Sequence, residues 1–172
     1  RMSKAPCRVV ARMAPSSPAA PRWHHVGVPP RRRIDPAVGL AAVQVCRAAG
    51  FTSGVGSGPA SGVGSGDVPA QASVPREDVA TAVRFTLEEL ATLAPGRSVE
   101  VRVPPFGATQ CVPGPVHRRG TPPSVVETDP ATWLAIAVGE LAWADAMESG
   151  RVRASGERAA LAQWLPLDRL SE

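Results

Sequence analysis

The stretch SVVETDPATWLAIAVGELAWADAMESGRVRASG, residues 124–156, predicts a strand, two helices and a second strand in that order. Residues 125–128 form a short strand-forming run, and Asp129-Pro130 follows as a helix N-cap with proline at the first helical position. The apolar residues after Pro130 predict a helix that ends near Gly139, because glycine readily adopts the left-handed conformation that stops a helix. The first half of the stretch is therefore a strand that leads directly into an apolar helix.

A shorter helix and a returning strand complete this stretch. The helix is predicted from about Trp143 to Ser149, and Gly150 ends it. Residues 151–154 then alternate charged side chains with small or apolar ones, which is typical of a half-exposed strand. Both helices are unusually apolar for their length, so we expect them to be covered on more than one side.

The strands upstream of this stretch have the clearest pattern in the chain. Residues 98–103 (SVEVRV) alternate valine with polar side chains, which predicts a strand with one buried and one exposed face. Pro104-Pro105 interrupts the pairing, and residues 106–112 predict a second strand that returns beside the first. Together with the strand around residues 125–126, three strands joined by short loops predict an antiparallel meander.

Two helices are predicted before these strands. Asp35-Pro36 begins the first and Gly50 ends it, whereas the longer one covers residues 75–94 and has acidic residues in its first turn. Each helix has apolar residues at helical spacing, and we expect these stripes to face the core. The stripes are Val38, Ala41, Ala42, Val45 and Ala49 in the first helix, bordered by Cys46, and Val79, Ala82, Val83, Thr86, Leu87, Leu90 and Ala94 in the second.

Composition divides the chain into segments of different character. Residues 1–34 contain eight Lys or Arg and no acidic residue, which predicts a disordered basic leader, and the helix of residues 35–50 follows it. A Gly/Ser-rich linker at residues 51–74 contains the pentapeptide GVGSG twice and separates this helix from a folded domain at residues 75–170.

Charge and hydropathy exclude two classes of function for the folded part. Residues 35–172 contain eleven basic against fifteen acidic residues, a net charge of −4, which argues against a nucleic-acid-binding surface. No apolar run reaches the length of about 18 residues that a membrane span needs, so the sequence predicts a soluble protein.

The stretch at residues 124–156 resembles the sterol carrier protein family. In that family a strand ending in an acidic residue leads into a helix of the form (F/W)LALxxG, then a helix ending in glycine, then a strand reading (K/R)(V/I)x(A/I)xG. Residues 99–112 (VEVRVPPFGATQCV) and 117–130 (HRRGTPPSVVETDP) are similar to its bacterial branch in particular. The residues that carry the resemblance in the first stretch are Asp129, Trp133, Leu134, Ile136, Gly139, Trp143, Met147, Gly150, Arg151, Val152 and Gly156.

The resemblance implies both a fold and a class of ligand. The fold is α+β, with a mostly antiparallel sheet of about five strands covered by helices, and with the long helix packed across one face. The function is noncatalytic binding, and transfer, of a hydrophobic or acyl-chain small molecule, such as a fatty acyl chain or sterol-like lipid, in the cytoplasm of a bacterium. The residues expected to line the site are Phe106, Trp133, Leu134, Ile136, Trp143, Met147, Trp164 and Leu165.

Two alternatives stay open for these residues. The same side chains can fill an ordinary core, since residues that line a tunnel and residues that fill a core have the same composition. The domain would then be a protein-interaction or dimerisation module without a ligand tunnel, and a homodimer is left open. Arg118 and Arg119 are either a solvated pair or an anchor for an anionic head group.

Catalysis and a cofactor are not expected. Cys111 and His117 are separated by a Pro-Gly-Pro turn and could form a nucleophile and base, but the sequence identifies no orienting group and no oxyanion site. The three cysteines are far apart, with no CxxC pair, so no metal site is predicted. We therefore expect a protein that is not an enzyme and needs no cofactor.

Overall fold

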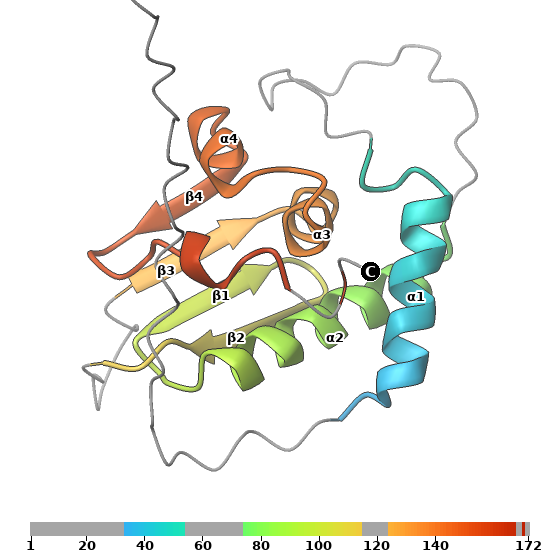
Figure 1. Cartoon of the computed structure of the whole chain (residues 1–172), viewed down its shortest axis with the longest axis horizontal. Coiled ribbons are helices and arrows are strands. Elements are labelled where there is room, and N and C mark those ends of the chain that lie inside the picture. Colours follow the sequence, from blue (N-terminus) through green and yellow to red (C-terminus); the bar gives the residue numbers. More distant parts are fainter. Residues whose placement is uncertain (1–32, 54–73, 115–123, 168–169, 171–172) are drawn as a thin grey trace, which may run out of the picture.

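The computed structural model describes residues 33–53, 74–114, 124–167 and 170. These residues form one four-stranded sheet with helices packed against it (Figure 1). In chain order the elements are α1 (Pro36–Ala48), α2 (Arg76–Leu93), β1 (Val99–Val103), β2 (Gly107–Cys111), β3 (Ser124–Thr128), α3 (Pro130–Val138), α4 (Trp143–Glu148), β4 (Val152–Ser155) and the short 3₁₀ helix η1 (Ala162–Trp164).

The strand order is β2-β1-β3-β4, so the predicted meander is wrong. β1 pairs antiparallel with β2 on one side and parallel with β3 on the other, and β4 pairs antiparallel with β3. The chain therefore crosses over between β2 and β3 instead of returning in a hairpin. A period-two pattern identifies a strand but carries no information about its neighbours, which is why the sequence misplaced β3. The described residues contain four strands where about five were expected, and most of their pairings are antiparallel, as predicted.

The two faces of the sheet differ as the alternation in β1 predicted. Val99, Val101 and Val103 are fully buried and belong to a core shared with α2 and α3. Glu100 and Arg102 point to the opposite face and are partly exposed. The helices therefore cover one face of the sheet, and the polar face is more open.

The local signals of residues 124–156 are confirmed. The Asp129 carboxylate accepts a hydrogen bond from the backbone N–H of Thr132 (3.0 Å), so it caps the first turn of α3. Gly139 has a φ of 83°, in the left-handed region, where it ends α3. α4 and β4 follow with boundaries within one residue of those predicted.

The buried faces predicted for the two N-terminal helices agree with the structure for α2 but not for α1. Every residue of the predicted stripe on α2 is buried, whereas on α1 the predicted face was wrong: Val38 is 57% exposed and Val45 43% exposed. α1 instead buries Gly39, Ala42, Val43 and Cys46. A Cβ at Gly39 would lie only 2.2 Å from Cγ of Phe85, so the absence of a side chain there lets α1 cross close to α2. The buried face of α1 is therefore the face whose small residues allow close packing against α2, and it is not the face that carries the most hydrophobic side chains.

Candidate ligand-binding groove

The predicted site residues of α3 lie in the core. Trp133 and Leu134 are 0% exposed and Ile136 is 1% exposed. The indole N–H of Trp133 donates to Oγ1 of Thr86 on α2 (2.8 Å), and that hydroxyl donates onward to the backbone of its own helix. Trp133 thus ties α3 to α2, and in this conformation all three side chains act as core residues.

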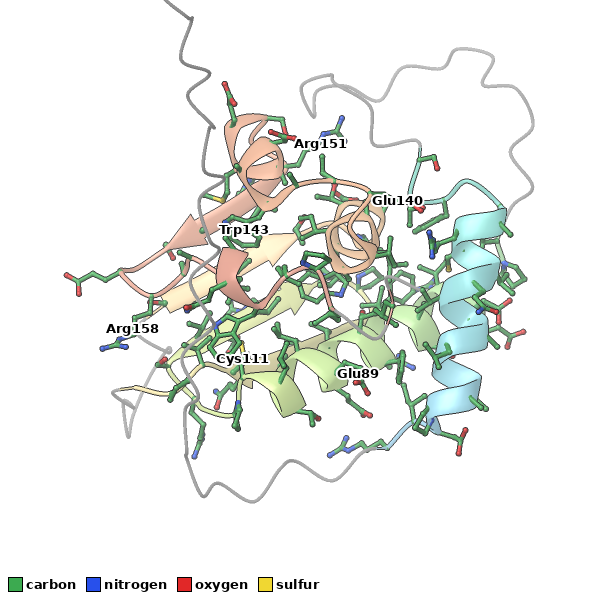
Figure 2. All side chains as sticks on the ribbon, in the orientation of Figure 1. Glu89, Cys111, Glu140, Trp143, Arg151 and Arg158 are labelled. Atoms are coloured by element: carbon green, nitrogen blue, oxygen red, sulfur yellow. The ribbon has the colours of Figure 1, made fainter. Side chains whose placement is uncertain are left out.

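The other predicted site residues lie around the margin of that core. Trp143, Trp164 and Leu165 are half-buried and pack against it, and Figure 2 shows Trp143 between α4 and the sheet. Met147 is 37% exposed. Arg118 and Arg119 lie outside the described residues. Only Phe106 among the predicted residues borders the groove that lies beside β2, and a ligand role for the others stays a prediction.

A large open space among the described residues is a groove between α2 and β2. Its volume is about 1070 Å³, which is large enough for a lipid-sized molecule. Figure 1 shows α2 running alongside β2, one of the two outer strands of the sheet. The groove is lined by Arg33, Ile34, Thr81, Arg84, Leu87, Glu88, Ala91, Phe106, Gly107, Ala108 and Thr109.

One end of the groove combines an aromatic ring with two guanidinium groups. Nε of Arg84 donates to the backbone carbonyl of Phe106 (2.9 Å), which holds the start of β2 against α2. Cζ of Arg76 lies 5.8 Å from the centre of the Phe106 ring, within the range of a cation–π contact. A second, smaller pocket of about 540 Å³ continues past Phe106 and includes Arg76 and Arg84. This end could therefore receive an anionic group beside an apolar one.

The opposite wall comes from the residues just before α1. Oε2 of Glu88 accepts hydrogen bonds from the backbone N–H groups of Arg33 (3.0 Å) and Ile34 (3.3 Å). These bonds join residues distant in sequence and place Ile34 beside Leu87 at the groove. The groove is thus lined by apolar and polar side chains together, and its charged residues are of both signs.

Sequence reasoning missed most of this groove. Leu87 was assigned to the core only, and Arg84 and Glu88 were not assigned any role. A signal was present, because Glu77, Thr81, Arg84 and Glu88 recur at helical spacing on α2 and form a polar stripe beside the apolar one. What the stripe faces, however, depends on the position of β2, which the predicted meander placed between β1 and β3 and which the structure places at the edge of the sheet.

The chemistry of Cys111 disfavours the catalytic alternative. Burial raises the pKa of the Cys111 thiol to about 12, so the thiolate needed for a nucleophile is disfavoured. Burial, and then the charge of Asp78, raises the pKa of Cys46 to about 11. His117 lies outside the described residues. Within those residues no three His, Cys, Asp or Glu side chains gather as a metal site would require.

The two thiols predict a loss of stability at alkaline pH. Folding raises their pKa values above the ordinary value of about 9, so the stability that the neutral thiols provide is complete below about pH 9. It is lost as the pH rises through about 11 and 12. We expect the free energy of unfolding to fall by about 4 kcal/mol between about pH 9 and pH 11, roughly 2 kcal/mol for each thiol. Chemical denaturation at several pH values measures this, and the chain has no tyrosine to add its own titration.

The Cys111→Ala variant is the control for that measurement. It should be less stable than the parent near neutral pH but should show a shallower loss as the pH rises. An equal alkaline slope in parent and variant would assign the effect to other groups.

The fold and the groove together define a mixed α/β domain with an open sheet, helices over one face and a ligand-sized space at one edge. Residues 75–167 match the family described as bacterial orthologues of the sterol carrier protein, SCP. The match covers more than half of the chain, so the chain belongs to this bacterial sterol-carrier-like family, as its motifs predicted. A search of curated proteins finds no match. In the ranges that the structure describes, no helix is both long enough and apolar enough to pass through a bilayer.

Proposed function

We propose that this domain binds a hydrophobic or acyl-chain small molecule without transforming it, and that the groove between α2 and β2 is the binding site. The observation that carries the proposal is the groove itself, about 1070 Å³ of space lined by apolar and polar side chains together. Family membership supports lipid as the class of ligand.

An acyl chain would lie against the apolar residues of the lining, chiefly the partly exposed Ile34 and Phe106. Each methylene removed from water contributes about 0.8 kcal/mol, so even a partly covered chain gains useful affinity. A carboxylate or phosphate at the end of the chain would meet Arg84 at the end of the groove next to Phe106. No group in this arrangement is poised to break a bond, and the function proposed is carriage in the cytoplasm.

The shape of the site supports transfer of the ligand. The groove lies at the surface, beside the edge strand, so a ligand could enter and leave without unfolding the core. Rapid exchange of this kind suits a carrier more than a storage protein.

The Phe106→Ala variant tests the location of the site. We expect the dissociation constant for a fluorophore-labelled long-chain fatty acid to rise about tenfold, because the chain loses an aromatic wall. The matched control is Met147→Ala, which removes an exposed side chain from α4 and should leave binding unchanged. Fluorescence titration measures both, with melting curves to confirm folding. A loss of binding with Met147→Ala but not with Phe106→Ala would place the ligand beneath α4 instead.

A second function is favoured by the filled core. Trp133, Leu134 and Ile136 occupy the space between helices and sheet without exposure to solvent, as they would in a protein-interaction module. Such a module would take up no labelled fatty acid and would show the same melting temperature with and without lipid. That pair of results would replace the carrier proposal with this one.

A further inference from the structure

We infer that α1, together with residues 33–34, is a detachable cover of the groove: it opens from α2 while the rest of the domain stays folded, and a bound ligand holds it closed. The inference rests on the proposed function for its ligand, but the separate opening of α1 is carried by observations of its own. It adds to that function a way to control when the groove takes up and releases a molecule.

The first observation is the place of α1 in the chain. The family match begins at residue 75, so α1 lies outside the matched domain in sequence, although it packs against α2. Between the two helices the sequence contains the Gly/Ser-rich linker, whose composition predicts a coil-like tether. A helix on such a tether can leave its binding surface and return to it, because the tether keeps the helix nearby.

The second observation is how weakly α1 is held. The residues that it buries all have small side chains: Gly39, Ala42, Val43 and Cys46. None of the largest fully buried side chains in the described part of the chain comes from α1. Because burial stabilises in proportion to apolar area, each residue of α1 contributes less than those of α2 and α3. The ion pair between Arg47 and Glu140 (3.0 Å) adds little, since both side chains are partly exposed. Local opening begins with elements that are held in this way.

The third observation joins α1 to the groove. Arg33 and Ile34 line the groove, and Asp35, the N-cap of α1, follows directly. The Glu88 carboxylate accepts hydrogen bonds from the backbone N–H groups of Arg33 (3.0 Å) and Ile34 (3.3 Å) and so keeps both residues at the groove. A movement of α1 away from α2 therefore carries Ile34 out of the groove. A ligand that contacts Ile34 binds the closed form more tightly than the open form, and by linkage it favours closure.

Two native cysteines report separately on α1 and on the sheet. Cys46 on α1 and Cys111 on β2 are both 0% exposed, and Figure 2 shows Cys111 away from α1. Burial raises the pKa of both thiols, so both react slowly in the closed, folded chain. Opening of α1 uncovers Cys46 and leaves Cys111 buried, whereas global unfolding uncovers both.

The test measures the rate at which a thiol reagent modifies each cysteine in the full chain carrying Cys7→Ser. Mass spectrometry identifies the modified site, and rates in denaturant give the intrinsic reactivity of each thiol. We expect Cys46 to react roughly tenfold faster than Cys111, or more, after this correction. A saturating fluorophore-labelled long-chain fatty acid should slow the modification of Cys46 by about threefold or more.

The Gly39→Val variant should open the cover without changing a groove residue. A Cβ at Gly39 would lie 2.2 Å from Cγ of Phe85, so a valine there forces α1 away from α2. Cys46 should then react about tenfold faster than in the parent, and the labelled fatty acid should dissociate faster, while the rate of Cys111 stays the same. The matched control is Ala41→Val, at an exposed position of the same helix, and it should behave like the parent.

Equal rates for Cys46 and Cys111 in the parent overturn the inference, because α1 would then open only when the whole domain unfolds. A Cys46 rate that bound fatty acid leaves unchanged also overturns it, because α1 would not cover the ligand. The proposed function fails separately. A chain whose Cys46 reacts faster than Cys111 but which binds no fatty acid removes the carrier function and keeps the opening of α1. A chain that binds fatty acid and shows equal rates keeps the function and removes the cover.

Discussion

Replacing Leu90 with aspartate is expected to lower the free energy of unfolding by about 5 kcal/mol. Leu90 is 0% exposed on the face of α2 that covers the sheet. The substitution loses about 2 kcal/mol of side-chain burial, and it places a carboxylate inside the apolar core, where the charged form is disfavoured. Small domains are stable by about 5–15 kcal/mol, so the variant should be largely unfolded or should melt at a much lower temperature. Urea denaturation followed by circular dichroism measures the change.

Leu93→Asp is the matched control on the same helix. Leu93 is 46% exposed, so a carboxylate there stays hydrated and the loss should be below about 1 kcal/mol. Leu87→Asp, at a residue 3% exposed, should behave like Leu90→Asp. Parent-like melting of Leu90→Asp would contradict the packing of α2 against the sheet.

Replacing Trp133 with alanine is expected to cost about 4 kcal/mol. Its side chain is the largest among the fully buried ones in the described residues. Truncation leaves a cavity between α3 and α2, and it removes the hydrogen bond that joins the two helices, Trp133 Nε1–H to Thr86 Oγ1 at 2.8 Å. Buried large-to-small changes of this size are among the most destabilising single substitutions. Thermal and urea denaturation of the purified variant give the value.

Trp133→Phe separates packing from the hydrogen bond. It keeps most of the apolar volume and removes the indole donor, so about 2 kcal/mol should be lost. Trp143→Ala changes a half-buried tryptophan at the margin of the core and should also cost less than Trp133→Ala. If Trp133→Ala were tolerated while ligand uptake fell, Trp133 would line a binding site, and the sequence-based assignment of its role would stand.

The elements that the sequence predicted well are those whose signals are local. Asp129 and Gly139 bound α3 because a carboxylate can cap the nearest free N–H groups and because glycine adopts a left-handed conformation without steric cost. The stripe on α2 and the alternation in β1 identified their buried faces, since each is a strong repeat within one element. Family membership was also readable from such local motifs.

The candidate site was less predictable, because it depends on which elements become neighbours. Phe106 was identified as a site residue, but its partners Arg84 and Leu87 come from α2, and only the position of β2 brings them together. Trp133 was assigned to a ligand site by its apolar character, which equally suits the core position it occupies. Composition cannot distinguish the two environments.

By itself, the sequence determined, to within one or two residues, where α1 to α4 and the four strands begin and end, which faces of α2 and β1 are buried, and the family to which the chain belongs. Only the tertiary structure decided the strand order, the buried face of α1 and the place of the groove. The physical reason is the distance along the chain over which each kind of interaction acts. Caps and periodic patterns act within a few residues, whereas the strand order and the close contact of Gly39 with Phe85 are set by packing between segments far apart in the chain.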